Sequence, residues 1–169
     1  MQIGDGKCVC ISQDGSMYEP IPWDEDCQAN ITTSICDSEA IEEFRYCFMK
    51  ECPVATLMGT DGIDDSYADA EEMYVLYRSI LAIFAEHGRE TGESEIQAFL
   101  PGLSRKGSGD DVSIAGIVSA SLSTAFIEVL KAQCEYSNAK AHREQAEREV
   151  ILAAEKAGIC VVSYEKKPR

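Results

Sequence analysis

The stretch of sequence that decides the fold is PVATLMGTDGIDDS, residues 53–66. An apolar run bounded by Pro on one side and Gly on the other is typical of a buried strand. The carboxylates that follow, Asp61, Asp64 and Asp65, repel one another unless a positive charge lies among them. A hard divalent cation, which prefers oxygen ligands, supplies such a charge. The alternative interpretation is a solvated acidic turn, because Asp and Gly are ordinary turn residues.

A second stretch, GSGDDVSIAGIV at residues 107–118, has the same parts in reverse order. A flexible glycine loop presents Asp110 and Asp111, and an apolar strand follows. If the two strands are antiparallel neighbours, Asp61 and Asp110 lie at one end of one sheet. A metal or phosphate site needs such a convergence of distant segments.

These residues resemble a known family. TDGIDDSY (60–67) and GSGDDVSIAGIV resemble the C-terminal half of the bacterial-type metal-dependent protein phosphatases, the 2C or PPM family. That family carries a T/S-D-G-x-x-D motif and, later in the chain, a D-N/D-[IV]-[ST] motif. Its G-D-S-R signature, which precedes a strand, is matched in part by IGDGKCVCI (3–11). The resemblance covers residues 1–118 and leaves the remainder of the chain uncovered.

The resemblance implies a fold and an activity. The fold is a β-sandwich of two antiparallel sheets packed face to face and flanked by helices, an αββα arrangement with metals at one end. The activity is that of a signalling hydrolase, which removes phosphate from phosphoserine and phosphothreonine in proteins. Two Mn²⁺ or Mg²⁺ ions bridge and activate the attacking water, so the resemblance implies no Ser or Cys nucleophile.

The resemblance also implies a set of metal ligands. Asp61 and Asp110 each match a ligand of the family's second metal. Asp5 and Asp65 match positions that, together with Asp61, are associated with a third and weaker metal. No catalytic side chain beyond these ligands is implied.

The sequence departs from the family pattern in three places. Asp111 stands where Asn is usual, and Asp64 has no role in the resemblance, so we interpret it as a surface residue. The family's early Asp and its D-G-H-G motif, whose Asp bridges the two catalytic metals, do not occur in the chain. We therefore expect a C-terminal piece of a longer phosphatase, or a split or degenerate relative, that binds metal weakly and is inactive in isolation.

Two other functions stay open at this point. One is a non-catalytic pseudophosphatase, or an interaction module that uses the tail helix. The other is a calcium-binding protein. The chain lacks the D-x-D-x-D-G loop of helix–loop–helix calcium sites, which argues against this function.

Hydrophobic periodicity predicts an α+β fold in which residues 1–118 form the phosphatase part and 119–169 a helical tail. Besides the two strands above, strands are expected over 2–12, 17–22, 30–37, 42–49 and 159–164, and helices over 67–88, 93–103 and from 119 to about Gly158. The tail helix either folds back on the sheet or reaches a protein partner. Its heptads are too irregular for a coiled coil.

Composition restricts the partners and the compartment. At 169 residues the chain is expected to form one domain with a core of its own. A net charge of −15 argues against nucleic acid and anionic membranes as partners. No signal peptide is visible, and no apolar run is long enough to span a bilayer.

The eight cysteines are expected to be free thiols. No C-x-x-C pair occurs, and Cys8, Cys10, Cys36 and Cys47 lie in apolar, strand-like runs where a free Cys behaves as a small hydrophobic residue. This usage predicts a reducing environment, and so a cytoplasmic protein.

Overall fold

A computed structural model of the chain describes residues 1–25, 27 and 32–159. The chain divides into two compact units, Met1–Lys131 and Ala132–Arg169. The first contains the sheet, two of the helices and the start of the third, and the second contains the rest of that third helix. The predicted boundary between residues 1–118 and 119–169 stays a prediction.

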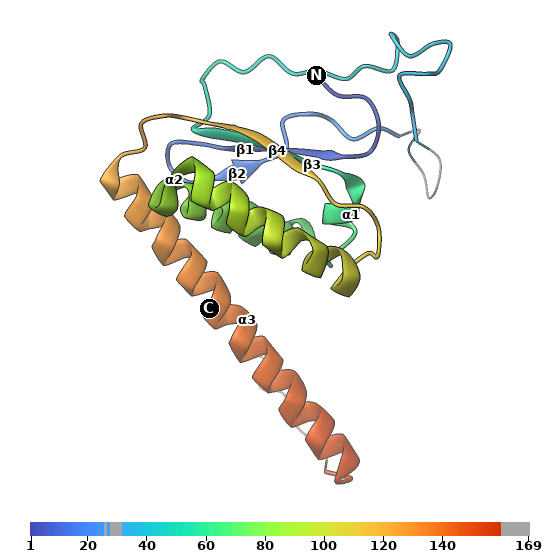
Figure 1. Cartoon of the computed structure of the whole chain (residues 1–169). Coiled ribbons are helices and arrows are strands. Elements are labelled where there is room, and N and C mark those ends of the chain that lie inside the picture. Colours follow the sequence, from blue (N-terminus) through green and yellow to red (C-terminus); the bar gives the residue numbers. More distant parts are fainter. Residues whose placement is uncertain (26, 28–31, 160–169) are drawn as a thin grey trace, which may run out of the picture. The chain divides into compact units, whose positions relative to one another are not determined.

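The first unit is built on one antiparallel sheet, whose strands lie in the order β2-β1-β3-β4 (Figure 1). The strands are β1 (Lys7–Ile11), β2 (Met17–Tyr18), β3 (Ala55–Gly59) and β4 (Ile114–Val118). The strands predicted over 2–12 and 17–22 are present as the antiparallel pair β1 and β2, although β2 is only two residues long. The two apolar runs that precede Asp61 and follow Asp110 are β3 and β4, and they are antiparallel neighbours.

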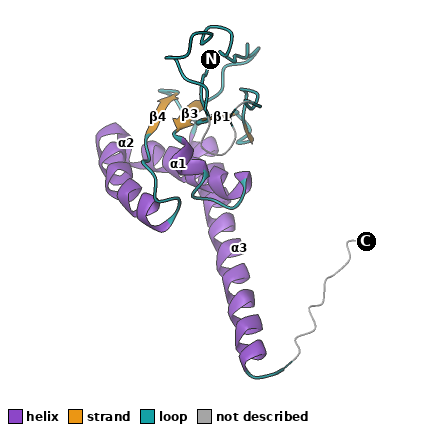
Figure 2. Cartoon of the chain, turned by 90° about the vertical axis from the view of Figure 1, so that its right-hand side faces the viewer, coloured by secondary structure: helices purple, strands orange, loops and turns teal. Residues whose placement is uncertain are grey.

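One face of this sheet is packed against helices. Alternate residues of β1 and β3, such as Val9 and Leu57, are buried against the apolar side of α2 (Ala70–Lys106). Figure 2 shows helices α1 and α2 on one side of the strands and the N-terminal loops on the other. The core residues that α2 contributes are Met73, Leu76, Tyr77, Ile80, Leu81 and Ile96.

Helix α2 consists of two helical segments joined at Gly88. This glycine has a φ of 76°, a left-handed conformation that a helix interior does not contain and that glycine adopts readily. The two predicted helices are therefore present with their break at Gly88. The first segment is capped by the side chain of Asp69, which accepts a hydrogen bond from the Glu72 N–H (2.9 Å).

The strands predicted over 30–37 and 42–49 are wrong for the residues described. Residues 32–50 form turns and loops, apart from an isolated bridge between Gln2 and Arg45. Both β1 and β3 are already paired on both sides, and this segment crosses the open face of the sheet, where the Met49 sulfur lies 3.8 Å from the Cys10 sulfur. Within the described residues the protein therefore has one sheet and not two.

The same correction applies to two cysteines. Cys8 and Cys10 lie in β1 as predicted, but Cys36 and Cys47 are exposed in the loop. Burial raises the pKa of the Cys8 thiol to about 11, which makes it a poor nucleophile. The seven cysteines in the described part of the chain are free, and Cys160 lies outside it.

The predicted long tail helix is α3 (Thr124–Lys156). Its first turns belong to the first unit, where Phe126 and Leu130 are buried in the core. In the second unit it carries i,i+4 ion pairs such as Arg143–Glu147 (2.9 Å). The strand predicted over 159–164 falls outside the described residues except for Ile159. None of the helices described is apolar over a length that would carry it across a bilayer.

Candidate metal centre

Three acidic segments meet at one end of the sheet because of the strand register. Lys7 pairs with Gly59, and Gly59 pairs with Ile114. The residues just before β1, just after β3 and just before β4 therefore lie at the same end. Each of these three segments carries one predicted ligand, and these are Asp5, Asp61 and Asp110.

The Asp61 and Asp110 segments are joined directly through Thr60. Its N–H donates to the Ser113 carbonyl (3.1 Å), and its hydroxyl donates to the Asp111 carbonyl (3.1 Å). The same hydroxyl accepts from the Ser113 N–H (3.0 Å). These bonds extend the β3–β4 pairing up to the carboxylates.

Gly62 allows the closest approach between these segments. A Cβ at this position would lie 2.6 Å from the Asp111 carbonyl oxygen and 3.3 Å from the Asp110 Cβ. The obstruction is backbone, which cannot rotate away. The glycine of the T-D-G sequence is thus needed where helix α1 (Asp61–Asp64) meets the Asp110 loop.

Two serines that sequence analysis did not single out hold the glycine loop against α1. Ser66 and Ser108 both donate their hydroxyl protons to the Gly62 carbonyl, at 2.7 and 2.9 Å. The Ser108 N–H in turn donates to the Ser66 hydroxyl (3.1 Å). Their signal in the sequence was their position directly beside the two acidic motifs.

The carboxylates of Asp61 and Asp110 are held by the same kind of hydrogen bond as each other. In each, Oδ1 accepts the N–H of the following residue, Gly62 or Asp111, at 2.8 Å. One oxygen of each carboxylate is therefore fixed by the backbone of the next residue.

Asp5 and Asp65 lie on the segments next to this pair. A Cβ at Gly6 would be 2.7 Å from the Gly59 carbonyl oxygen, so the turn that carries Asp5 lies against the end of β3. Asp65 ends helix α1, where its N–H donates to the Asp61 carbonyl (2.9 Å). The structure thus brings the segments of all four predicted ligands to one end of the sheet.

Asp64 is not the surface residue that was predicted. Its side chain is half-buried, and Oδ1 is buried with no hydrogen-bond partner among the described residues. Burial raises the pKa of this carboxyl to about 6, and the nearby Lys7 ammonium offsets part of the rise. The short helix α1 turns this residue inward, which a turn-like interpretation of the acidic run did not anticipate.

The donor chemistry at this end fits a hard divalent cation. All the candidate ligands are carboxylates, and the unpartnered Asp64 oxygen is an acceptor that a cation would satisfy. The described residues do not, however, contain a group of three or more His, Cys, Asp or Glu side chains arranged around one point. An ion bound here would take few protein ligands and keep several waters, as Mg²⁺ commonly does.

Comparison with protein families places the chain in a family. The family model for protein phosphatase 2C matches residues 1–101. The chain belongs to the protein phosphatase 2C family. The resemblance inferred from the motifs is thereby confirmed, and membership relates the chain to protein phosphatases.

The extent of the 2C match bears on the individual ligands. It includes Asp5, Asp61 and Asp65, and it ends before Asp110. The assignment of Asp110 therefore depends on the GDDVS motif and on the pairing of β4 with β3. Comparisons with curated proteins and with solved structures returned no match.

Proposed function

We propose that the chain supplies one half of a metal-dependent protein serine/threonine phosphatase site. Asp61 and Asp110 would bind one Mn²⁺ or Mg²⁺, and Asp5 and Asp65 would complete a weaker site beside it. The observation that supports this proposal is the β3–β4 register, extended by Thr60, which joins the Asp61 and Asp110 segments in a member of the 2C family.

The reaction replaces the phosphorus–oxygen ester bond with a bond to a water oxygen and leaves inorganic phosphate and a free Ser or Thr hydroxyl. A bound divalent ion would lower the pKa of that water and orient it. The chain's own residues would fix the ion: Thr60 and Gly62 set the distance between the two ligand segments, and backbone N–H groups orient the carboxylates.

The two-sheet sandwich belongs to the same proposal. The sheet face opposite α2 bears uncharged side chains, and two of them are conspicuously exposed, Met58 at 48% and Ile117 at 79%. A second sheet packs on such a face at about 10 Å. The apolar side chains left open on this face support the proposal.

Residues 1–169 alone are expected to bind Mn²⁺ weakly and to hydrolyse little substrate. Hydrolysis in this family's manner uses two ions, and Asp61 with Asp110 supply ligands to one of them. The chain contains no D-G-H-G sequence to bridge the pair.

The test is hydrolysis of a phosphothreonine peptide at saturating Mn²⁺. Joining an N-terminal segment that carries D-G-H-G should raise the rate, and Asp61→Ala or Asp110→Ala should then abolish it, because each removes a metal ligand. Glu90→Gln, an exposed acid on α2, is the matched control and should leave the rate unchanged. Full activity from residues 1–169 alone would contradict the one-ion assignment, and inactivity of the joined protein would favour the non-catalytic alternative.

A further inference from the structure

We propose that Arg45 is a positioning residue that fixes the Gly4–Asp5–Gly6 turn and so sets the affinity of Asp5 for a divalent cation. The inference extends the proposed function and rests on it. The sequence pattern placed Arg45 in a predicted strand, over 42–49, and gave it no role. The family match assigns it none either.

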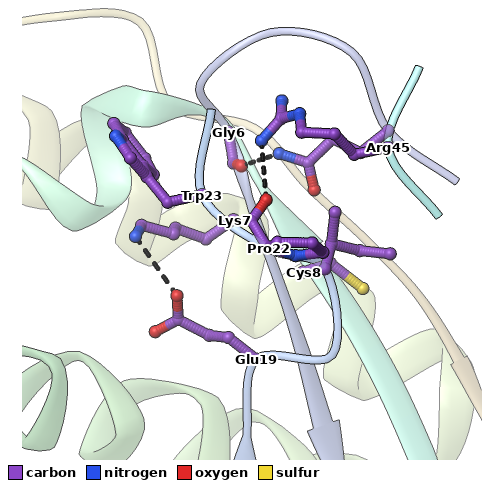
Figure 3. A pocket seen from close by; sticks show the side chains of 9 residues that line it. Gly6, Lys7, Cys8, Glu19, Pro22, Trp23 and Arg45 are labelled. Carbon is purple, nitrogen blue, oxygen red and sulfur yellow. Dashed lines mark hydrogen bonds and ion pairs between the residues drawn. The ribbon is translucent and has the colours of Figure 1, made fainter. Parts of the chain in front are cut away.

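Arg45 binds the turn through its guanidinium. Nη2 donates to the Gly4 carbonyl. Nη1 donates to the Pro22 carbonyl at 2.8 Å (Figure 3). Nη2 also pairs with the Asp24 carboxylate at 3.3 Å. Its backbone adds two bonds to Gln2, so side chain and main chain of Arg45 both hold the N-terminal segment.

A second set of contacts holds the same turn from its other groups. The Gly4 N–H donates to the Thr33 hydroxyl (3.0 Å), and that hydroxyl donates to Asp24 Oδ2 (2.8 Å). The Gln2 side-chain amide donates to the Gly6 carbonyl. Gly4, before Asp5, is thus fixed by Arg45 and Thr33. Gly6, after Asp5, is fixed by Gln2, whose backbone bonds to that of Arg45.

The Asp5 carboxylate takes no part in these contacts. Within the part of the chain that the structure describes, no hydrogen bond or ion pair involves it. The network therefore orders the backbone around Asp5 and leaves the carboxylate free to bind a ligand, which is how outer residues orient the ligands of metal sites.

The burial of the network explains why it must be arginine. Asp24 is 5% exposed and the Arg45 side chain is 15% exposed, so the pair is shielded from water. A guanidinium reaches two carbonyls and a carboxylate at once because its donors point along fixed directions. A lysine at this position keeps the charge but cannot make the three contacts together.

The only tryptophan of the chain reports on this region. Trp23 follows Pro22, and the Lys7 ammonium lies 4.4 Å from its ring centroid. Figure 3 shows Trp23, Lys7 and Arg45 around one small hollow beside the Gly6 turn. The fluorescence of Trp23 therefore gives a readout that does not depend on phosphatase activity.

The experiment is a titration of residues 1–169 with Mn²⁺, in which binding is measured by calorimetry and by Trp23 fluorescence. Arg45→Lys and Thr33→Val are each expected to raise the Mn²⁺ dissociation constant roughly 10-fold, as changes to outer residues of metal sites do. Arg89→Lys is the matched control, because Arg89 is 85% exposed and pairs only with Glu93 among the contacts described. Circular dichroism verifies that each variant is folded. If Arg45→Lys does not fold, the Mn²⁺ affinity of Thr33→Val tests the proposal.

A double-mutant comparison shows whether Arg45 acts through Asp5. In an Asp5→Asn background, Arg45→Lys should cause no further loss of Mn²⁺ affinity. An equal loss with and without Asp5, or no loss at all from Arg45→Lys and Thr33→Val, overturns the proposal. The proposed function fails separately, if Asp61→Asn and Asp110→Asn leave Mn²⁺ affinity unchanged while Asp5→Asn lowers it.

Discussion

The three acidic segments at one end of the sheet are held in place by two different means. The Asp61 and Asp110 loops are joined by strand register, Thr60 and the contact at Gly62, which are mostly backbone interactions. The Asp5 turn is held by the side chains of Arg45, Thr33 and Gln2. Backbone pairing tolerates most side-chain changes, whereas a side-chain network depends on each of its members.

The difference teaches which features of the site can be altered separately. If the account is right, substitutions in the Arg45 network change the Asp5 turn and leave the Asp61–Asp110 contact intact. Substitutions at Thr60 or Gly62 do the reverse.

The largest effect on stability is expected from Arg45→Met. The change removes the Arg45 charge beside the buried Asp24 carboxylate, which should lower the free energy of unfolding by about 3 kcal/mol. Urea denaturation measures the change. Arg89→Met, at an exposed position, should alter the same free energy by less than about 0.5 kcal/mol, and equal effects of the two would show that the Arg45 network does not stabilise the fold.

Gly62→Ala should have the next largest effect. The added Cβ meets the Asp111 carbonyl oxygen at 2.6 Å, so α1 and the Asp110 loop must move apart. We expect a loss of about 2 kcal/mol, in the range of overpacked sites. The control is Gly102→Ala, because an added Cβ there meets no atom within 4 Å apart from its own helix backbone. Alanine at this position should stabilise helix α2 by up to about 1 kcal/mol. Similar losses of stability at both glycines would exclude the close approach at Gly62.

Thr60→Val should have a smaller effect. The substitution keeps the shape of the side chain and removes the hydroxyl that bonds to the Asp111 carbonyl and the Ser113 N–H. Partial access of water to this exposed residue limits the expected loss to about 1 kcal/mol. Thr91→Val, on the exposed surface of α2, is the control in the same denaturation experiment, and a loss no larger than the control's would remove Thr60 from the account.

Much of the fold followed from local pattern. Strands β3 and β4, the break at Gly88 and the long helix α3 were predicted because period and glycine position are local properties. The segment 32–50 was mispredicted because its Tyr46 and Phe48 alternation suits a strand, yet the segment lies over the sheet face, where both rings are exposed. Whether such a pattern forms a strand depends on a free neighbour for pairing, which is a tertiary property.

The site was predicted to a similar extent. The segments of Asp61 and Asp110 were expected to converge because each adjoins a strand, on the condition that the two strands are antiparallel neighbours, which they are. The role of these residues as metal ligands stays a prediction. The contacts of Arg45 and Thr33 with Gly4 were not predicted, since they span 41 and 29 residues. The burial of Asp64 depends on helix α1, which is one turn long and leaves almost no periodic signal.

The measurement that tests the central claim most directly is a Mn²⁺ binding cycle on Asp61→Asn, Asp110→Asn and the double variant. If both carboxylates bind the same ion, each single change should weaken binding by roughly 10-fold or more, and the double variant should lose less than the sum of the two free-energy changes. Glu90→Gln should bind as the unaltered chain does. Unchanged affinity in both single variants, or strictly additive losses, would show that Asp61 and Asp110 do not share a metal ion and would contradict the account.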